Sequence, residues 1–87
     1  MEINFKDTAL EDIEYFKKSG NIQIQKKITE LIADIMLHPE TGLGKPEQLK
    51  HELTGCWSRR LDTKHRIVYR VSKNTLYVLS LRGHYSK

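Results

Sequence analysis

The C-terminal half of the sequence concentrates residues that can cleave a phosphodiester bond without a metal ion. Such cleavage of RNA needs a general base for the ribose 2′-hydroxyl, a cation for the phosphorane-like transition state, and an acid for the departing 5′-oxygen. Glu47 can serve as the base, Arg66 as the cation and His84 as the acid. Arginine offers paired donors to phosphate oxygens, and histidine titrates near neutral pH. The residue types therefore fit this chemistry, and the fold must supply the geometry.

The net charge and the length of the chain indicate the kind of partner and the number of domains to expect. The 87-residue chain carries a net charge of +4, which favours an anionic partner, either a nucleic acid or an acidic protein. Ordinary surface lysines would give the same net charge, so the charge alone does not establish that the protein binds an anionic partner. The arginines of the C-terminal half favour phosphate: Arg59, Arg60, Arg66, Arg70 and Arg82. The length predicts a single domain over residues 1–87 that buries about 60–65% of its unfolded surface.

Cysteine usage and the chain start indicate a soluble, cytoplasmic protein without a cofactor. Cys56 is the only cysteine, so no intrachain disulfide can form, and we expect it to be a buried or semi-buried small apolar residue. The N-terminus lacks the features of a signal peptide, and no stretch reaches transmembrane length. The histidines at 38, 51 and 65 lack a spacing that would assemble zinc ligands with Cys56. We therefore expect no metal, no cofactor and no membrane contact.

The N-terminal half predicts a strand followed by two helices. Alternating apolar residues predict a strand over residues 2–6. A helix should begin near Thr8, with Glu11 completing a capping box, and should end at Gly20. A second helix should run from about Asn21 until Pro39 stops it. Its apolar stripe comprises Ile24, Ile28, Leu31, Ile32, Ile35 and Met36. The short turn between them predicts an antiparallel helix pair.

The C-terminal half predicts a loop and then a sheet. Residues 41–45 form a glycine-containing loop that delivers Glu47. The β-rich runs 57–61, 65–71 and 75–82 should form an antiparallel sheet. In the middle run, Ile67, Tyr69 and Val71 should meet the helices, leaving Arg66, Val68 and Arg70 on a face open to a ligand. Whether Arg82 and His84 join Arg66 depends on register, because a one-residue slip exchanges the faces. The predicted class is α+β, with two N-terminal helices on a small, mostly antiparallel sheet.

Over essentially its whole length, the chain resembles the YoeB (Txe) family of the RelE/ParE toxin superfamily. The resemblance is carried by Gly44-Lys45-Pro46-Glu47, Leu49-Lys50-His51, Trp57-Ser58-Arg59-Arg60, His65-Arg66-Ile67-Val68-Tyr69 and His84-Tyr85. It implies a RelE-like fold and the toxin of a type II toxin–antitoxin system. It further implies a ribosome-dependent messenger-RNA endonuclease that blocks translation.

The resemblance also implies roles for single residues. Glu47 matches the family's general base, Arg66 its phosphate-stabilising arginine, His84 its general acid, and Tyr85 a residue that orients the substrate. Lys50, His51 and Arg60 match positions that hold RNA or the ribosome in the family, and we expect Arg59, from the same cluster of arginines, to bind RNA or the ribosome with them. The implied products are a 2′,3′-cyclic or 3′-phosphate and a 5′-hydroxyl, formed without a metal.

The implied partners are the ribosome, messenger RNA and a cognate acidic antitoxin of the YefM/Phd type, whose tail folds over the toxin. Family members often form homodimers, and operator DNA is bound only through the toxin–antitoxin complex. The chain departs from its relatives at Cys56, where an aromatic residue is common, and at Lys64, where some carry an acid. Ser86 and Lys87 extend past the terminal motif, and the roles of Lys64 and of this extension stay open.

Two other functions remain alternatives at this point. The ParE branch poisons DNA gyrase by binding, and its members generally lack the Glu, Arg and His constellation seen here. A non-catalytic RNA-binding module would need only the basic face. Taken singly, Glu47 could be a solvated loop carboxylate and Arg66 a surface ion-pair partner of little energetic weight.

Overall fold

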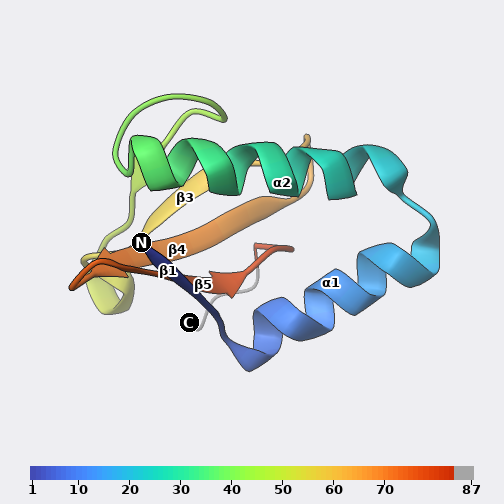
Figure 1. The fold of residues 1–87 in the computed structure, drawn as a ribbon, viewed down its shortest axis with the longest axis horizontal. Coiled ribbons are helices and arrows are strands. Elements are labelled where there is room, and N and C mark those ends of the chain that lie inside the picture. The colour runs from blue at the N-terminus through green and yellow to red at the C-terminus, as the bar shows by residue number, and fades with distance from the viewer. Residues whose placement is uncertain (84–87) are drawn as a thin grey trace.

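The computed structural model describes residues 1–83, and Figure 1 shows two helices lying over one face of a sheet. The elements are β1 (Glu2–Phe5), α1 (Asp7–Ser19), α2 (Ile22–Leu37), β2 (Glu47–Gln48), the short 3₁₀ helix η1 (His51–Leu53), β3 (Trp57–Arg60), β4 (Arg66–Ser72) and β5 (Thr75–Ser80). The five strands lie in the order β1-β5-β4-β3-β2. Only β1 is parallel to its neighbour, whereas the other pairs are antiparallel. The predicted α+β class is confirmed.

The start of α1 differs from the prediction. The helix begins at Asp7 after the N-cap Lys6, which makes no side-chain capping bond. The expected capping box of Thr8 and Glu11 is therefore wrong, because both residues already lie inside the helix. The reason is the preceding strand: the Lys6 N–H still donates to the Val78 carbonyl at 2.9 Å. The chain thus leaves the sheet and enters the helix within one residue.

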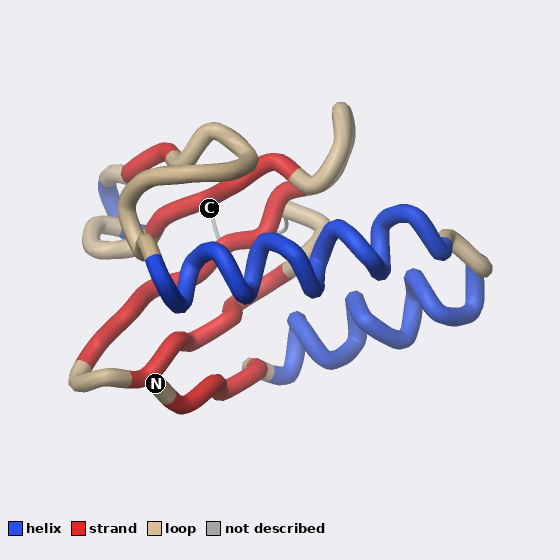
Figure 2. The backbone as a smooth tube through the Cα atoms, turned by 45° about the horizontal axis from the view of Figure 1, so that its top comes forward, coloured by secondary structure: helices blue, strands red, loops and turns tan. Residues whose placement is uncertain are grey.

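The other helix boundaries follow the sequence signals. Gly20 has a left-handed φ of 71° and closes α1, a conformation that glycine adopts without a Cβ clash. Asn21 caps α2 by accepting the Ile24 N–H on its side chain at 3.1 Å. The helix ends at Leu37, two residues before Pro39. Figure 2 shows the two helices side by side and antiparallel, as predicted.

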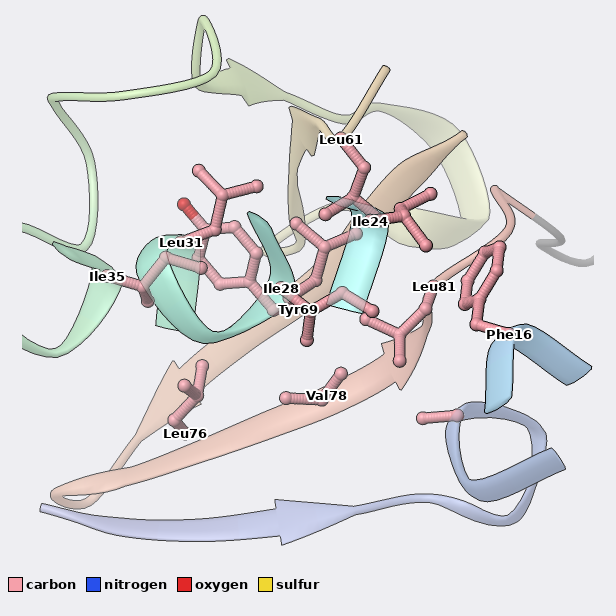
Figure 3. Packing of buried hydrophobic residues seen from close by; sticks show 12 residues of the cluster. Phe16, Ile24, Ile28, Leu31, Ile35, Leu61, Tyr69, Leu76, Val78 and Leu81 are labelled. Atoms are coloured by element: carbon pink, nitrogen blue, oxygen red, sulfur yellow. The ribbon is translucent and has the colours of Figure 1, made fainter. Parts of the chain in front are cut away.

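The core lies between the helices and the face of the sheet that they cover (Figure 3). Its buried members are Ala9, Phe16, Ile24, Ile28, Leu31, Ile35, Leu61, Ile67, Tyr69, Leu76, Val78 and Leu81. The predicted apolar stripe of α2 and the predicted inward face of β4 both contribute to it. Within the described residues, no helix is long and apolar enough to cross a bilayer.

The opposite face of the sheet is less open than predicted. Val68 lies at its centre with 0% exposure, flanked in the ladder by Ser58 on β3 and Ser80 on β5, which are also buried. Among the arginines of this face, Arg60 is exposed, and Arg66 and Arg70 are half-buried. A ligand on this face would therefore meet guanidinium groups beside the exposed carboxylate of Glu47.

A bulge in the β4–β5 ladder decides the register that the sequence left open. Tyr69 pairs with Val78 but Val68 pairs with Ser80, so Leu79 is an extra residue on β5. The insertion places Ser80 opposite Val68 and leaves Leu81 in the core. Arg82 lies just beyond the strand and stacks on the Tyr15 ring of α1, with its Cζ 3.6 Å from the ring centroid. The Arg82 side chain therefore lies against α1, whereas the Arg66 side chain reaches Glu47.

Candidate functional site

Glu47 and Arg66 come together at the sheet edge formed by β2. Glu47 begins this two-residue strand and lies opposite Ser58 of β3, while Arg66 is the first residue of β4. The Arg66 Nη1 donates to Glu47 Oε1 at 3.1 Å and to the Ser58 hydroxyl at 3.4 Å. The Glu47 side chain is 62% exposed and the Arg66 side chain 32%. A carboxylate and a guanidinium are thus adjacent and accessible to solvent.

The loop before Glu47 is held against β3 by a close backbone approach at Gly44. The Arg60 N–H donates to the Gly44 carbonyl at 2.7 Å. Gly44 has a φ of 79°, and a Cβ there would lie 3.0 Å from the Arg60 carbonyl and 3.1 Å from Leu31 Cδ2. Only glycine fits such a position without displacing its neighbours. The sequence predicted a loop here, and this close approach explains how the loop delivers Glu47 to a defined place.

Arg59 lies on the other face of β3 and is fully buried. Its Nη1 donates to Asp34 Oδ2 of α2 at 2.6 Å, and its Nε donates to the Tyr69 hydroxyl at 3.1 Å. The remaining acceptors are the backbone carbonyls of His38, Thr41 and Leu43. With 0% of its surface exposed, Arg59 cannot reach RNA or the ribosome, so its predicted binding role is wrong. The pleat of β3 turns Arg59 inward and Arg60 outward.

The hydrogen bonds of Arg59 tie the segment after α2 to the sheet. The hydrogen bond from Arg59, followed by that from the Leu43 N–H, holds the pKa of Asp34 below its usual range. The Tyr69 hydroxyl, whose pKa is raised chiefly by burial, donates to the Pro39 carbonyl at 2.6 Å. This network fixes the chain that leads to Glu47, and Asp34 is a participant that the sequence analysis missed.

The remaining predicted binding residues are all exposed. Arg60 lies opposite Arg66 in the β3–β4 ladder, on the same face of the sheet. Lys50 is the N-cap of η1 and His51 its first residue, a few residues beyond Glu47. Their side chains are free to contact a macromolecule, and their binding roles stay predictions.

Asp12 anchors the C-terminal segment and was also missed by the sequence analysis. This α1 residue is 4% exposed, and its Oδ2 accepts the backbone N–H groups of Leu81 at 2.8 Å and Arg82 at 3.2 Å. The Gly83 N–H in turn donates to the Arg66 carbonyl at 3.1 Å. A signal was present, since Asp12 shares the buried helix face with Ala9 and Phe16. The predicted catalytic residues His84 and Tyr85 lie outside the described residues.

Two further expectations concern Cys56 and metal ions. Cys56 is buried at 6% exposure, as predicted, and burial raises the pKa of its thiol. Across residues 1–83, no group of three or more histidine, cysteine or acidic side chains is arranged to hold a metal ion. The side chains that meet at the described site are those of Glu47, Ser58 and Arg66.

Comparisons with known proteins cover almost the whole chain. Residues 5–85 match the family model described as "YoeB-like toxin of bacterial type II toxin-antitoxin system". Toxin YoeB of Streptomyces coelicolor is 42% identical over 85 residues, covering 98% of this chain and 100% of that protein. Toxin YoeB of Escherichia coli K12 is 41% identical with the same coverage. Among solved structures, the YoeB/ParE toxin from Agrobacterium tumefaciens superposes with a TM-score of 0.91 at 38% identity, covering 98% of this chain and 100% of that one.

Proposed function

Because the chain belongs to the family of YoeB-like toxins of bacterial type II toxin–antitoxin systems, we propose that it is an endoribonuclease that cleaves messenger RNA on the ribosome and thereby arrests translation. The observation that carries this proposal is the 3.1 Å hydrogen bond between Glu47 and Arg66. In RNA, the 2′-hydroxyl and the 3′-phosphate sit on neighbouring ribose carbons. A base and a phosphate clamp that act on one nucleotide must therefore lie side by side.

The proposed reaction uses these neighbours in one displacement. Glu47 takes the proton of the 2′-hydroxyl as the 2′-oxygen attacks the adjacent phosphorus. The Arg66 guanidinium, positioned by the Ser58 hydroxyl, stabilises the charge on the equatorial oxygens. The bond to the 5′-oxygen breaks, and His84 donates the proton that this oxygen needs. The products are a 2′,3′-cyclic phosphate, which can open to a 3′-phosphate, and a 5′-hydroxyl.

The roles of His84 and Tyr85 in this mechanism are assigned from their positions in the sequence. Gly83, the residue before His84, is hydrogen-bonded to the Arg66 backbone, which supports assigning the acid to the following residue. We assign Tyr85 to substrate orientation, because an aromatic ring can stack on a base of single-stranded RNA. Lys50, His51 and Arg60 complete the proposed contacts with RNA and the ribosome.

The test is incubation of the purified protein with ribosomes that carry a defined messenger RNA. Cleavage of the message with 5′-hydroxyl ends is the expected result. The rate should survive brief EDTA treatment of the assembled complex while the ribosomes stay intact, because the proposed step uses no metal. Double-strand DNA breaks with intact messages would instead support gyrase poisoning, and RNA binding without products would support a non-catalytic module.

We further propose an acidic, YefM-like antitoxin as partner. Solved complexes of YoeB with YefM from Staphylococcus aureus and a YoeB dimer from the same organism support an antitoxin and self-association. The YoeB chain of one such complex is 41% identical to this chain, with a TM-score of 0.87. Carboxylates of the partner would neutralise Arg60 and Arg66, and operator DNA would be bound only through the complex. An affinity between this protein and its antitoxin that does not fall with rising salt would contradict this electrostatic account.

The proposed cleavage takes place in the cytoplasm, where the ribosomes are.

Replacing Asp12 with alanine is expected to lower cleavage by about 10- to 100-fold without weakening RNA binding. The change removes the acceptor for the Leu81 and Arg82 N–H groups, so the segment leading to His84 loses its anchor, and small misplacements of a reacting group cost rate steeply. Asp12 thus acts as a positioning residue. Single-turnover rates and RNA affinities measure the effect, with Glu11→Ala as the exposed control on the same helix. Loss of binding in proportion to rate would contradict this role.

A further inference from the structure

Two hollows beside α2 share part of their lining. The first, of about 370 Å³, is lined by Lys27, Gly44, Lys45, Arg60, Leu61, Asp62 and Thr63. The second, of about 290 Å³, continues past Lys27, Leu61 and Asp62 to the start of α2 at Asn21. Because the hollows share these three residues, they adjoin, and we call them together the α2 groove. Figure 3 shows Leu61 beside Ile24, and both residues line the second hollow.

Two lining residues of the α2 groove are neighbours of the proposed catalytic pair, one in the sequence and one in the sheet. Lys45, in its wall, precedes Glu47 by two residues in the same loop. Arg60, in the same wall, lies opposite Arg66 in the β3–β4 ladder. An RNA strand held at Glu47 and Arg66 could therefore continue around the edge of the sheet into the α2 groove without leaving the protein surface.

The charge of the α2 groove suits a polyanion. Three cations, Lys27, Lys45 and Arg60, face one carboxylate, Asp62. That carboxylate is already engaged: it accepts the N–H groups of Lys64 and His65 at 2.8 and 2.7 Å, and lies 3.1 Å from His65 Nδ1. Lys27 has an ion-pair neighbour in Glu30 only at 4.0 Å, with its side chain 38% exposed. The cations are thus available to a ligand.

The walls of the α2 groove are preformed. The 2.7 Å bond from Arg60 N–H to the Gly44 carbonyl fixes the loop wall to β3. Lys45 follows with a left-handed φ of 56°, which sets the direction of its side chain. Lys27 projects from a 16-residue helix. A ligand would find these charges at fixed separations, so little ordering would be needed on binding.

We propose that the α2 groove binds the phosphodiester backbone of RNA next to the cleaved bond, with Lys27 and Lys45 pairing with its phosphates. This inference rests on the proposed nuclease function, but the binding of RNA can be measured without cleavage. The RNA is either the substrate strand or ribosomal RNA that borders it. The amino groups act as point charges that neutralise phosphates without reading sequence.

The test compares two double variants that change the net charge equally. Both are made in a Glu47→Gln background, which removes the proposed base. Lys27→Gln with Lys45→Gln alters the groove, whereas Lys18→Gln with Lys26→Gln alters exposed lysines of α1 and α2 outside its lining. Affinity for a fluorescent single-stranded oligoribonucleotide and for empty ribosomes is measured across salt concentrations. Equal melting temperatures establish that both variants are folded.

The groove variant should bind RNA several-fold more weakly, and its plot of log affinity against log salt should become shallower. The expected decrease in slope is about 1.4, because each phosphate of a single strand that is no longer neutralised by a lysine accounts for about 0.7. The control variant should keep the parental slope. Weaker binding of the oligonucleotide identifies the substrate strand as the ligand, whereas weaker binding of ribosomes alone identifies ribosomal RNA.

Unchanged binding to both RNAs, or a change confined to an acidic protein partner, would overturn the proposal. The failure of the nuclease proposal would look different. If the unmutated protein cleaves no message but the groove variant still binds RNA more weakly than its control, the groove is upheld and the nuclease is rejected.

Discussion

Glutamine in place of Glu47 is expected to slow single-turnover cleavage of messenger RNA by about two to four orders of magnitude. The amide keeps the shape of the side chain and an oxygen that can accept the Arg66 hydrogen bond, but it cannot take the 2′-hydroxyl proton. The Glu47–Arg66 pair is accessible to solvent, and such surface ion pairs contribute little to stability. The melting temperature and RNA affinity should therefore stay close to those of the parent.

The matched control for this experiment is Glu52→Gln. Glu52 is an exposed carboxylate of η1, only five positions further along the chain. Its replacement changes the net charge by the same amount and should leave the rate unchanged. Cleavage by Glu47→Gln at the parental rate would reject base catalysis by this residue, and an equal loss in both variants would point to charge instead of proton transfer.

Methionine in place of Arg59 is expected to destabilise the fold by about 3–5 kcal/mol, the usual cost of removing one member of a buried ion pair. The change strips donors from Asp34 and from the carbonyls of His38, Thr41 and Leu43. In a domain of this size, the loss corresponds to a fall in melting temperature of more than about 12 °C. Thermal and urea unfolding, followed by circular dichroism, measure it.

Arg60→Met is the control, because Arg60 is the sequence neighbour of Arg59 and carries the same charge. It is exposed, so its removal should change the melting temperature little and should instead weaken RNA binding. Both variants are made in the Glu47→Gln background. Similar melting temperatures for the two would contradict the structural role of Arg59, and unchanged RNA affinity of the folded Arg60 variant would contradict its pairing with phosphate.

The sequence by itself determined both helices, four of the five strands described in residues 1–83 and the residue types of the site, whereas β2 and η1 were not predicted. Periodicity along α2, the glycine at 20 and the proline at 39 specified where helices run and stop, because each acts within a few residues of itself. Alternation in β4 likewise identified the inward face of Ile67 and Tyr69. Resemblance to YoeB-like toxins, carried by motifs in the same local stretches, correctly identified the family.

Tertiary structure decided which of those residues meet. Glu47 and Arg66 are 19 positions apart, Arg59 and Asp34 25 apart, and Asp12 and Leu81 69 apart. Each of these hydrogen bonds depends on strand pairing or helix packing, which no local pattern specifies. Arg59 and Arg60 look equivalent in the sequence, yet the pleat of β3 buries one and exposes the other. The extra residue at Leu79 sets the faces of Ser80 and Leu81. A side chain's role at this site follows from the face it occupies, and only the assembled sheet fixes that face.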